Sequence, residues 1–147
     1  MTLRTGLLLV ACALGGCGHY VLQGKVLSGP TPGVSVVDAD DERLQARGLD
    51  RATYELTLDP RSLNRKVLAR GIVAPDGSFS IPIREPGAGI LEYDFELLVR
   101  HEGHGSAVWG FRLPPRGKAL FVTLAPGPDR YQPREDPYRE AETYMHN

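Results

Sequence analysis

Strict alternation of apolar and charged residues is the feature that most constrains what this chain can fold into. Between residues 91 and 100, every second side chain from Leu91 to Val99 is apolar, and charged residues stand at most of the positions between them. Successive side chains of a strand point to opposite faces, so this period of two predicts a strand with one buried and one solvated face, as in antiparallel sheets. An amphipathic helix would instead need an apolar period of 3.6.

The same period recurs in short segments up to residue 125. Strands are expected at 53–58, 67–73, 78–83, 91–100, 107–113 and 119–124. The first strand is expected at 20–27 and 34–38, interrupted by a kink that contains glycine and proline. The 17 glycines and 12 prolines favour turns over long helices. The fold class expected from about seven short strands is all-β, a seven-stranded antiparallel β-sandwich.

Proline-containing segments indicate how some strands are connected. Ala74-Pro75-Asp76-Gly77 predicts a turn, because glycine adopts a positive φ at little cost. Pro114-Pro115-Arg116-Gly117 separates the last two expected strands, which we expect to form a hairpin. Pro82 has no N–H to donate, so its strand is expected at a sheet edge, or with the proline facing solvent.

The first residues have the pattern of an export signal. Arg4 provides a positive charge, and the uncharged run from Gly6 to Leu14 matches the apolar core of a secretory signal peptide. This run is too short to cross a bilayer, which needs about 20 apolar residues.

The motif Leu14-Gly15-Gly16-Cys17 resembles the lipobox of bacterial lipoproteins. The resemblance implies a lipoprotein signal peptide at 1–16 and lipidation of Cys17 by fatty acids such as palmitate. The lipid would anchor the protein to a membrane of the bacterial cell envelope, facing the periplasm or the exterior. Leu9-Val10-Ala11-Cys12 also fits the motif, but it leaves only residues 5–9 as an apolar core, so Cys17 is the expected site. The mature chain would then hold no free thiol, which excludes thiol chemistry.

Two regions follow the signal peptide. Residues 17–125 contain all the strand segments and are expected to form one domain. Residues 126–147 contain four prolines and no Val, Ile or Leu. This segment cannot bury enough apolar surface to offset the entropy of ordering, so it is expected to be a disordered, charged, Pro-rich tail.

The order of these signals resembles that of carboxypeptidase regulatory-like domains. Gly24-Lys25-Val26 fits the opening strand of that family, and residues 74–81 fit its turn and the strand that follows it. The resemblance implies a transthyretin-like, or prealbumin-like, β-sandwich over residues 17–125, with an immunoglobulin-like sandwich as the nearest alternative. The chain departs from the family in a long acidic insertion from Asp38 to Asp50, and in His104, which stands where the family has an aromatic residue.

Two clusters contain residues of the types that bind metal ions. His101-Glu102-Gly103-His104 offers zinc ligands, but the spacing differs from the H-E-x-x-H motif, and we interpret it as a polar loop. The run from Asp38 to Glu42 offers oxygen ligands, but it lacks the glycine and glutamate positions of an EF-hand loop. We interpret it as a solvated loop and leave calcium binding open. No metal or other cofactor is expected.

The sequence contains no motif that indicates catalysis. It has no G-x-S-x-G nucleophile motif and no Gly-rich phosphate loop, and its net charge of -1 disfavours nucleic acid as a partner. Trp109 and Tyr54 could present aromatic rings to a sugar or a peptide, but Trp109 alternates with Phe111 and is expected in the core.

The expected function is that of a non-catalytic, lipid-anchored module of the cell envelope. Its role would be structural, adhesive or accessory, in binding an envelope protein or a glycan. A carbohydrate-binding module that uses exposed aromatic residues and a small envelope enzyme are the alternatives.

Overall fold

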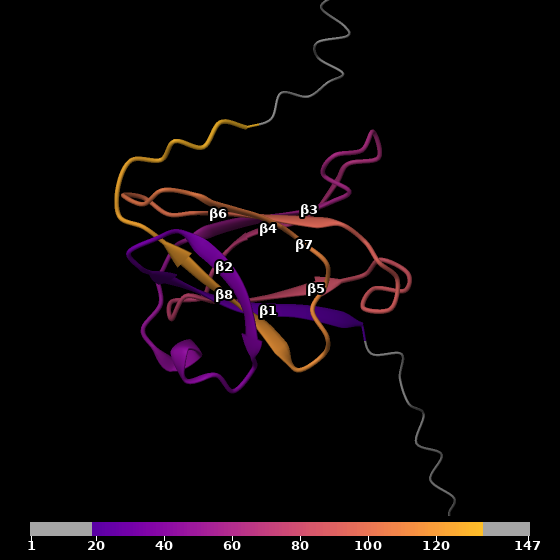
Figure 1. The fold of residues 1–147 in the computed structure, drawn as a ribbon, viewed down its shortest axis with the longest axis horizontal. Helices are drawn as coiled ribbons and strands as arrows, with labels where there is room; N and C mark the ends of the chain where they lie inside the picture. Colours follow the sequence, from indigo (N-terminus) through magenta and orange to yellow (C-terminus); the bar gives the residue numbers. More distant parts are fainter. Residues whose placement is uncertain (1–18, 134–147) are drawn as a thin grey trace, which may run out of the picture.

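The computed structural model describes residues 19–133, which form two four-stranded β-sheets packed face to face (Figure 1). One sheet has the strand order β2-β8-β1-β5 and the other β4-β3-β6-β7. The elements are β1 (Tyr20–Ser28), β2 (Gly33–Asp38), the 3-10 helix η1 (Glu42–Gln45), β3 (Thr53–Leu58), β4 (Lys66–Ile72), β5 (Ser78–Ile83), β6 (Phe95–Arg100), β7 (Ala107–Phe111) and β8 (Lys118–Leu124). The expected all-β sandwich is confirmed. The predicted signal peptide and Cys17 lie outside the described residues.

The sandwich has eight strands in place of the seven expected. Residues 33–38 do not continue the first strand beyond a kink. They form the separate strand β2, which pairs antiparallel with β8 at the edge of the sheet. β8 lies between β2 and β1 and pairs with β1 in parallel. The expectation of a wholly antiparallel sandwich is therefore also wrong.

The expected hairpin between the last two strands is wrong as well. β7 pairs with β6 in one sheet, whereas β8 enters the other sheet between β1 and β2. The connection at 112–117 therefore crosses from one sheet to the other. The buried Tyr20 hydroxyl donates a 2.5 Å hydrogen bond to the Pro114 carbonyl, which ties this crossing to the start of β1. A turn signal predicts that the chain changes direction, but it does not identify the partner of the next strand.

The core lies between the sheets and consists of alternate residues of each strand. In β6, Phe95, Leu97 and Val99 are buried, which confirms the period of two. Leu91 was expected on the same buried face but is exposed. The alternating sequence pattern begins at Leu91, whereas β6 begins only at Phe95. Leu91 therefore belongs to the loop 84–94 and not to the strand.

Pro82 and the turn before its strand are as expected. Pro82 faces solvent, and β5 is an edge strand. Gly77 has a φ of 83°, and its N–H donates to the Ala74 carbonyl at 2.8 Å. The Asp76 carboxylate accepts hydrogen bonds from the side chain and the backbone N–H of Ser78, and these bonds lower its pKa.

The first residues of the expected tail contact the sandwich. The N–H of Gly127 donates to the Gly103 carbonyl at 2.9 Å, and Asp129 lies 3.3 Å from the guanidinium of Arg100. That guanidinium also lies 5.0 Å from the centre of the Tyr131 ring. The chain therefore follows the surface of the domain up to Tyr131. Residues 134–147, to which the expectation of disorder also applies, lie outside the described residues.

Candidate functional site

A groove of about 680 Å³ lies beside β1, β5 and the segment 39–48. In the register of the two strands, Gln23 is opposite Ser80 and Lys25 is opposite Ser78. All four side chains line the groove. They alternate with core residues such as Leu22 and therefore lie on the face of the sheet that points away from the core. This arrangement places amide, hydroxyl and ammonium groups in one depression.

Lys25 carries the buried charge of this groove and is only 8% exposed. Its ammonium donates a 2.8 Å hydrogen bond to the Leu44 carbonyl and lies 3.9 Å from an Asp76 oxygen. An ammonium has three N–H donors, and 3.9 Å is beyond hydrogen-bond distance. Within residues 19–133, Lys25 therefore keeps donor capacity toward the groove. The groove is suited to a ligand rich in oxygen acceptors.

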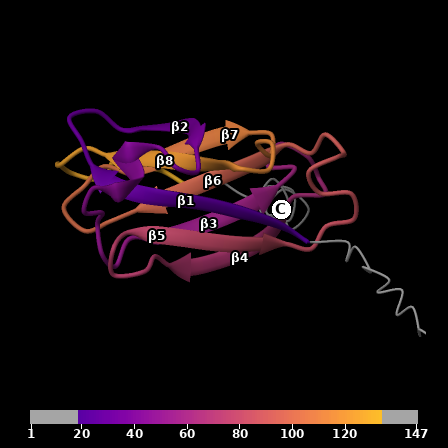
Figure 2. The same cartoon turned by 90° about the horizontal axis from the view of Figure 1, so that it is seen from below.

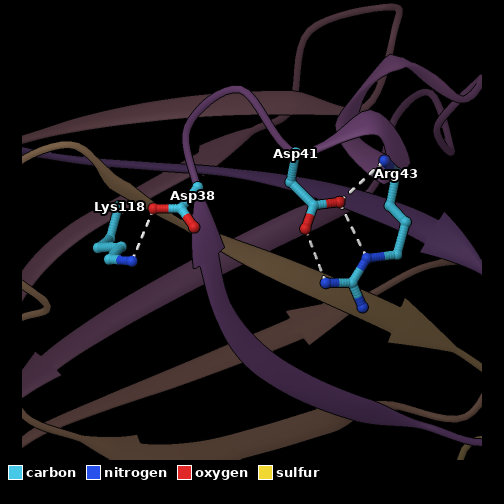
Figure 3. Close-up of polar contacts among 4 residues, drawn as sticks. All are labelled: Asp38, Asp41, Arg43 and Lys118. Carbon is cyan, nitrogen blue, oxygen red and sulfur yellow. Dashed lines mark hydrogen bonds and ion pairs between the residues drawn. The ribbon is translucent and has the colours of Figure 1, made fainter.

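The acidic run from Asp38 to Glu42 makes ion pairs with cations of the protein itself (Figure 3). Asp38 lies 2.6 Å from the ammonium of Lys118. Asp41 accepts hydrogen bonds from the side chain and the backbone N–H of Arg43, which lower its pKa to about 2. It is also the N-cap residue of η1. In this arrangement, oxygens that a calcium ion would need are directed at Lys118 and Arg43.

His101 and His104 lie together in the loop between β6 and β7. Their Nδ1 atoms are 3.0 Å apart, and the Nε2 atom of His104 lies 3.1 Å from the Ser28 hydroxyl. Both ring nitrogens of His104 thus have partners within the protein. Among the residues that the structure describes, no three His, Cys, Asp or Glu side chains come close enough to hold a metal ion.

Trp109 is 44% exposed, so its expected place in the core is wrong. Its register opposite Leu97 does put it on the inner face of the sheet. β7 is an edge strand, however, so Trp109 has a paired strand on one side only. The edge strand of the other sheet, β2, contacts β7, and its Val36 is also half exposed. Tyr54 is half-buried with its ring near Phe79, which leaves Trp109 as the exposed aromatic residue of the described segment.

Comparisons of the chain with models of protein families, with curated proteins and with solved structures gave no match. The described part of the chain contains no helix with the length and hydropathy needed to span a membrane.

Proposed function

We propose that this protein is a lipid-anchored, non-catalytic module of the bacterial cell envelope. The observation that carries the proposal is the position of the lipobox-like motif relative to the domain. Leu14-Gly15-Gly16-Cys17 ends at Cys17, and β1 begins at Tyr20. Cleavage before Cys17 would thus remove the apolar segment and leave the sandwich intact, with Gly18 and His19 as its spacer from the lipid.

The proposal includes the resemblance to carboxypeptidase regulatory-like domains and their transthyretin-like sandwich. The two-sheet, all-β architecture and the glycine turn at Gly77 support it. In this interpretation the domain presents its surfaces to an envelope protein or a glycan, while the lipid holds it at the membrane.

Exchange of Cys17 for serine should abolish lipidation, because the thiol is the group that receives the diacylglycerol. Cells that express the full chain are grown with a labelled palmitate analogue, and the label on the protein is measured together with its resistance to alkaline extraction from membranes. The matched control is Cys12→Ser, which should keep both properties. Label that persists in Cys17→Ser and disappears in Cys12→Ser would move the anchor to Cys12. Label that is absent from the unmodified chain would refute the proposal.

Carbohydrate binding is a second candidate function, favoured by the exposed Trp109 and by the donors around Lys25. An indole face packs well against the apolar face of a sugar, and the groove offers hydrogen-bond donors to its oxygens. If the tryptophan is the binding surface, Trp109→Ala should remove binding on a glycan array and Lys25→Gln should keep it. The reverse result would assign binding to the groove, and no binding by the unmodified domain would count against this function.

A further inference from the structure

The proposed lipid anchor places one particular end of the sandwich at the membrane. Tyr20 is the third residue after Cys17, and three extended residues span at most about 11 Å. An acylated Cys17 lies at the level of the lipid headgroups, so the start of β1 must lie close to them. This argument rests on the proposed lipidation of Cys17.

Two loops lie at the same end as the start of β1 (Figure 2). Tyr20 pairs with Ile83 at the end of β5, from which the loop 84–94 continues. The loop 59–65 joins β3 to β4, and the N–H of Asp59 donates to the Asp94 carbonyl at 2.8 Å. We refer to the start of β1 and the loops 59–65 and 84–94 as the anchor end.

Three aliphatic side chains of the anchor end are exposed to solvent. Ile90 is 88% exposed, Leu63 72% and Leu91 56%. They come from two separate loops, which are linked by the hydrogen bond between Asp59 and Asp94 and by the 2.7 Å ion pair between Glu85 and Lys66, the first residue of β4. Single exposed apolar residues are common on soluble proteins, so these side chains acquire meaning from their position at the end that the anchor places near the membrane.

The loop 84–94 is built so that its apolar tip points outward. Ala88 packs against the core, and Gly89 lies so close to the Tyr20 ring that a Cβ at this position would be 2.7 Å from it. The N–H groups of Ile90 and Leu91 both donate to the Gly87 carbonyl, which closes a turn at the tip. The loop is thus fixed on its inner side, and its two aliphatic residues remain in solvent.

The loop 84–94 begins with a cation. Arg84 is exposed and makes no ion pair within residues 19–133. A guanidinium can bind the two oxygens of a phosphate at once, which suits a phospholipid headgroup. Exposed aliphatic residues together with such a cation suit a surface that lies at a lipid interface. The carboxylate next to Leu91, that of Glu92, is paired with Arg112 at 2.8 Å.

We infer that the anchor end lies on the membrane surface, with Leu63, Ile90 and Leu91 inserted among the lipid headgroups. The acyl chains would hold the protein on the membrane, and the loops would fix its orientation. The polar groove at Lys25 and the edge at Trp109 would then keep a defined orientation relative to the bilayer.

Fluorescence at Ile90 tests this orientation. Ile90→Cys, in the acylated protein, introduces one free thiol, because the proposed modification consumes that of Cys17 and cleavage removes Cys12. An environment-sensitive dye is attached there, and the protein is placed in vesicles of phosphatidylethanolamine and phosphatidylglycerol. We expect a blue-shifted emission and several-fold stronger quenching by spin-labelled lipid than at the control position.

The matched control is the same dye at Ile72→Cys. Ile72 is 67% exposed, but it lies at the far end of β4, about 20 Å along the strand from Lys66. Equal melting temperatures of both labelled proteins and the parent would establish that they are folded. If position 90 responds no more than position 72 in a protein that carries palmitate and stays with the vesicles, the inferred orientation is wrong and the anchor stands. A protein without palmitate would instead refute the proposed function.

Discussion

Exchange of Phe95 for alanine should lower the free energy of unfolding by about 3–5 kcal/mol, the usual cost of removing a buried phenylalanine. Phe95 is 1% exposed at the start of β6. Its ring lies 5.9 Å from that of Phe111 and 6.3 Å from that of Tyr93. The exchange therefore removes both ring contacts and leaves a cavity between the sheets. Denaturant titration measures the loss.

Ile90→Ala is the control for this experiment. Ile90 is an aliphatic residue of the adjacent loop, but it is almost fully exposed, so the exchange should change stability by less than about 0.5 kcal/mol. Equal losses for the two variants would show that the face assignment of β6 is wrong. A small loss for Ile90→Ala also agrees with a role of this side chain outside the fold.

The period of two predicted the positions of the strands well, because alternation directly reports on which side chains are buried. β3 and β5 have the bounds expected from the sequence, Thr53–Leu58 and Ser78–Ile83. The alternation of apolar and polar residues does not indicate which strands are neighbours in a sheet. The position of β8 between β1 and β2 depends on contacts far apart in the sequence, and the turn at 114–117 is compatible with both a hairpin and a crossing.

The errors at Trp109 and Leu91 have two different physical causes. For Trp109, alternation identified the inner face correctly, but it could not tell an edge strand from a central one. For Leu91, the pattern continued into a loop. Leu91, which belongs to the exposed tip of the anchor end, was therefore assigned to a strand, and the three-dimensional structure shows it in solvent next to Ile90.

The groove was even less accessible to sequence reasoning. Lys25 alternates with core residues and has the pattern of an ordinary surface lysine. It is buried because the segment 39–48 folds beside it and offers the Leu44 carbonyl. Sequence patterns within one strand contain no information about a segment that packs on its outer face.

Gly77 is the position where that segment is held, and Gly77→Ala should be nearly as damaging as Phe95→Ala. The Gly77 carbonyl accepts a 2.9 Å hydrogen bond from the N–H of Val26, and the N–H of Gly48 donates to the Asp76 carbonyl at 3.0 Å. A Cβ on Gly77 would lie 2.6 Å from the Val26 oxygen and 2.7 Å from the Gly48 Cα. These are backbone atoms of the central strand β1 and of the insertion, so neither can move without breaking hydrogen bonds.

Two costs should add in Gly77→Ala. The positive φ costs about 1–2 kcal/mol for a residue with a Cβ, and crowding in a packed site costs about 1–3 kcal/mol more. Gly117→Ala separates them, because Gly117 has nearly the same φ, 84°, and a Cβ at this position would meet no atom within 4 Å beyond its chain neighbours. We expect denaturant titration to give the φ cost alone for Gly117→Ala and a clearly larger loss for Gly77→Ala. If the two losses are equal, the insertion does not pack on the turn, and the groove beside Lys25 would lose the wall formed by residues 39–48.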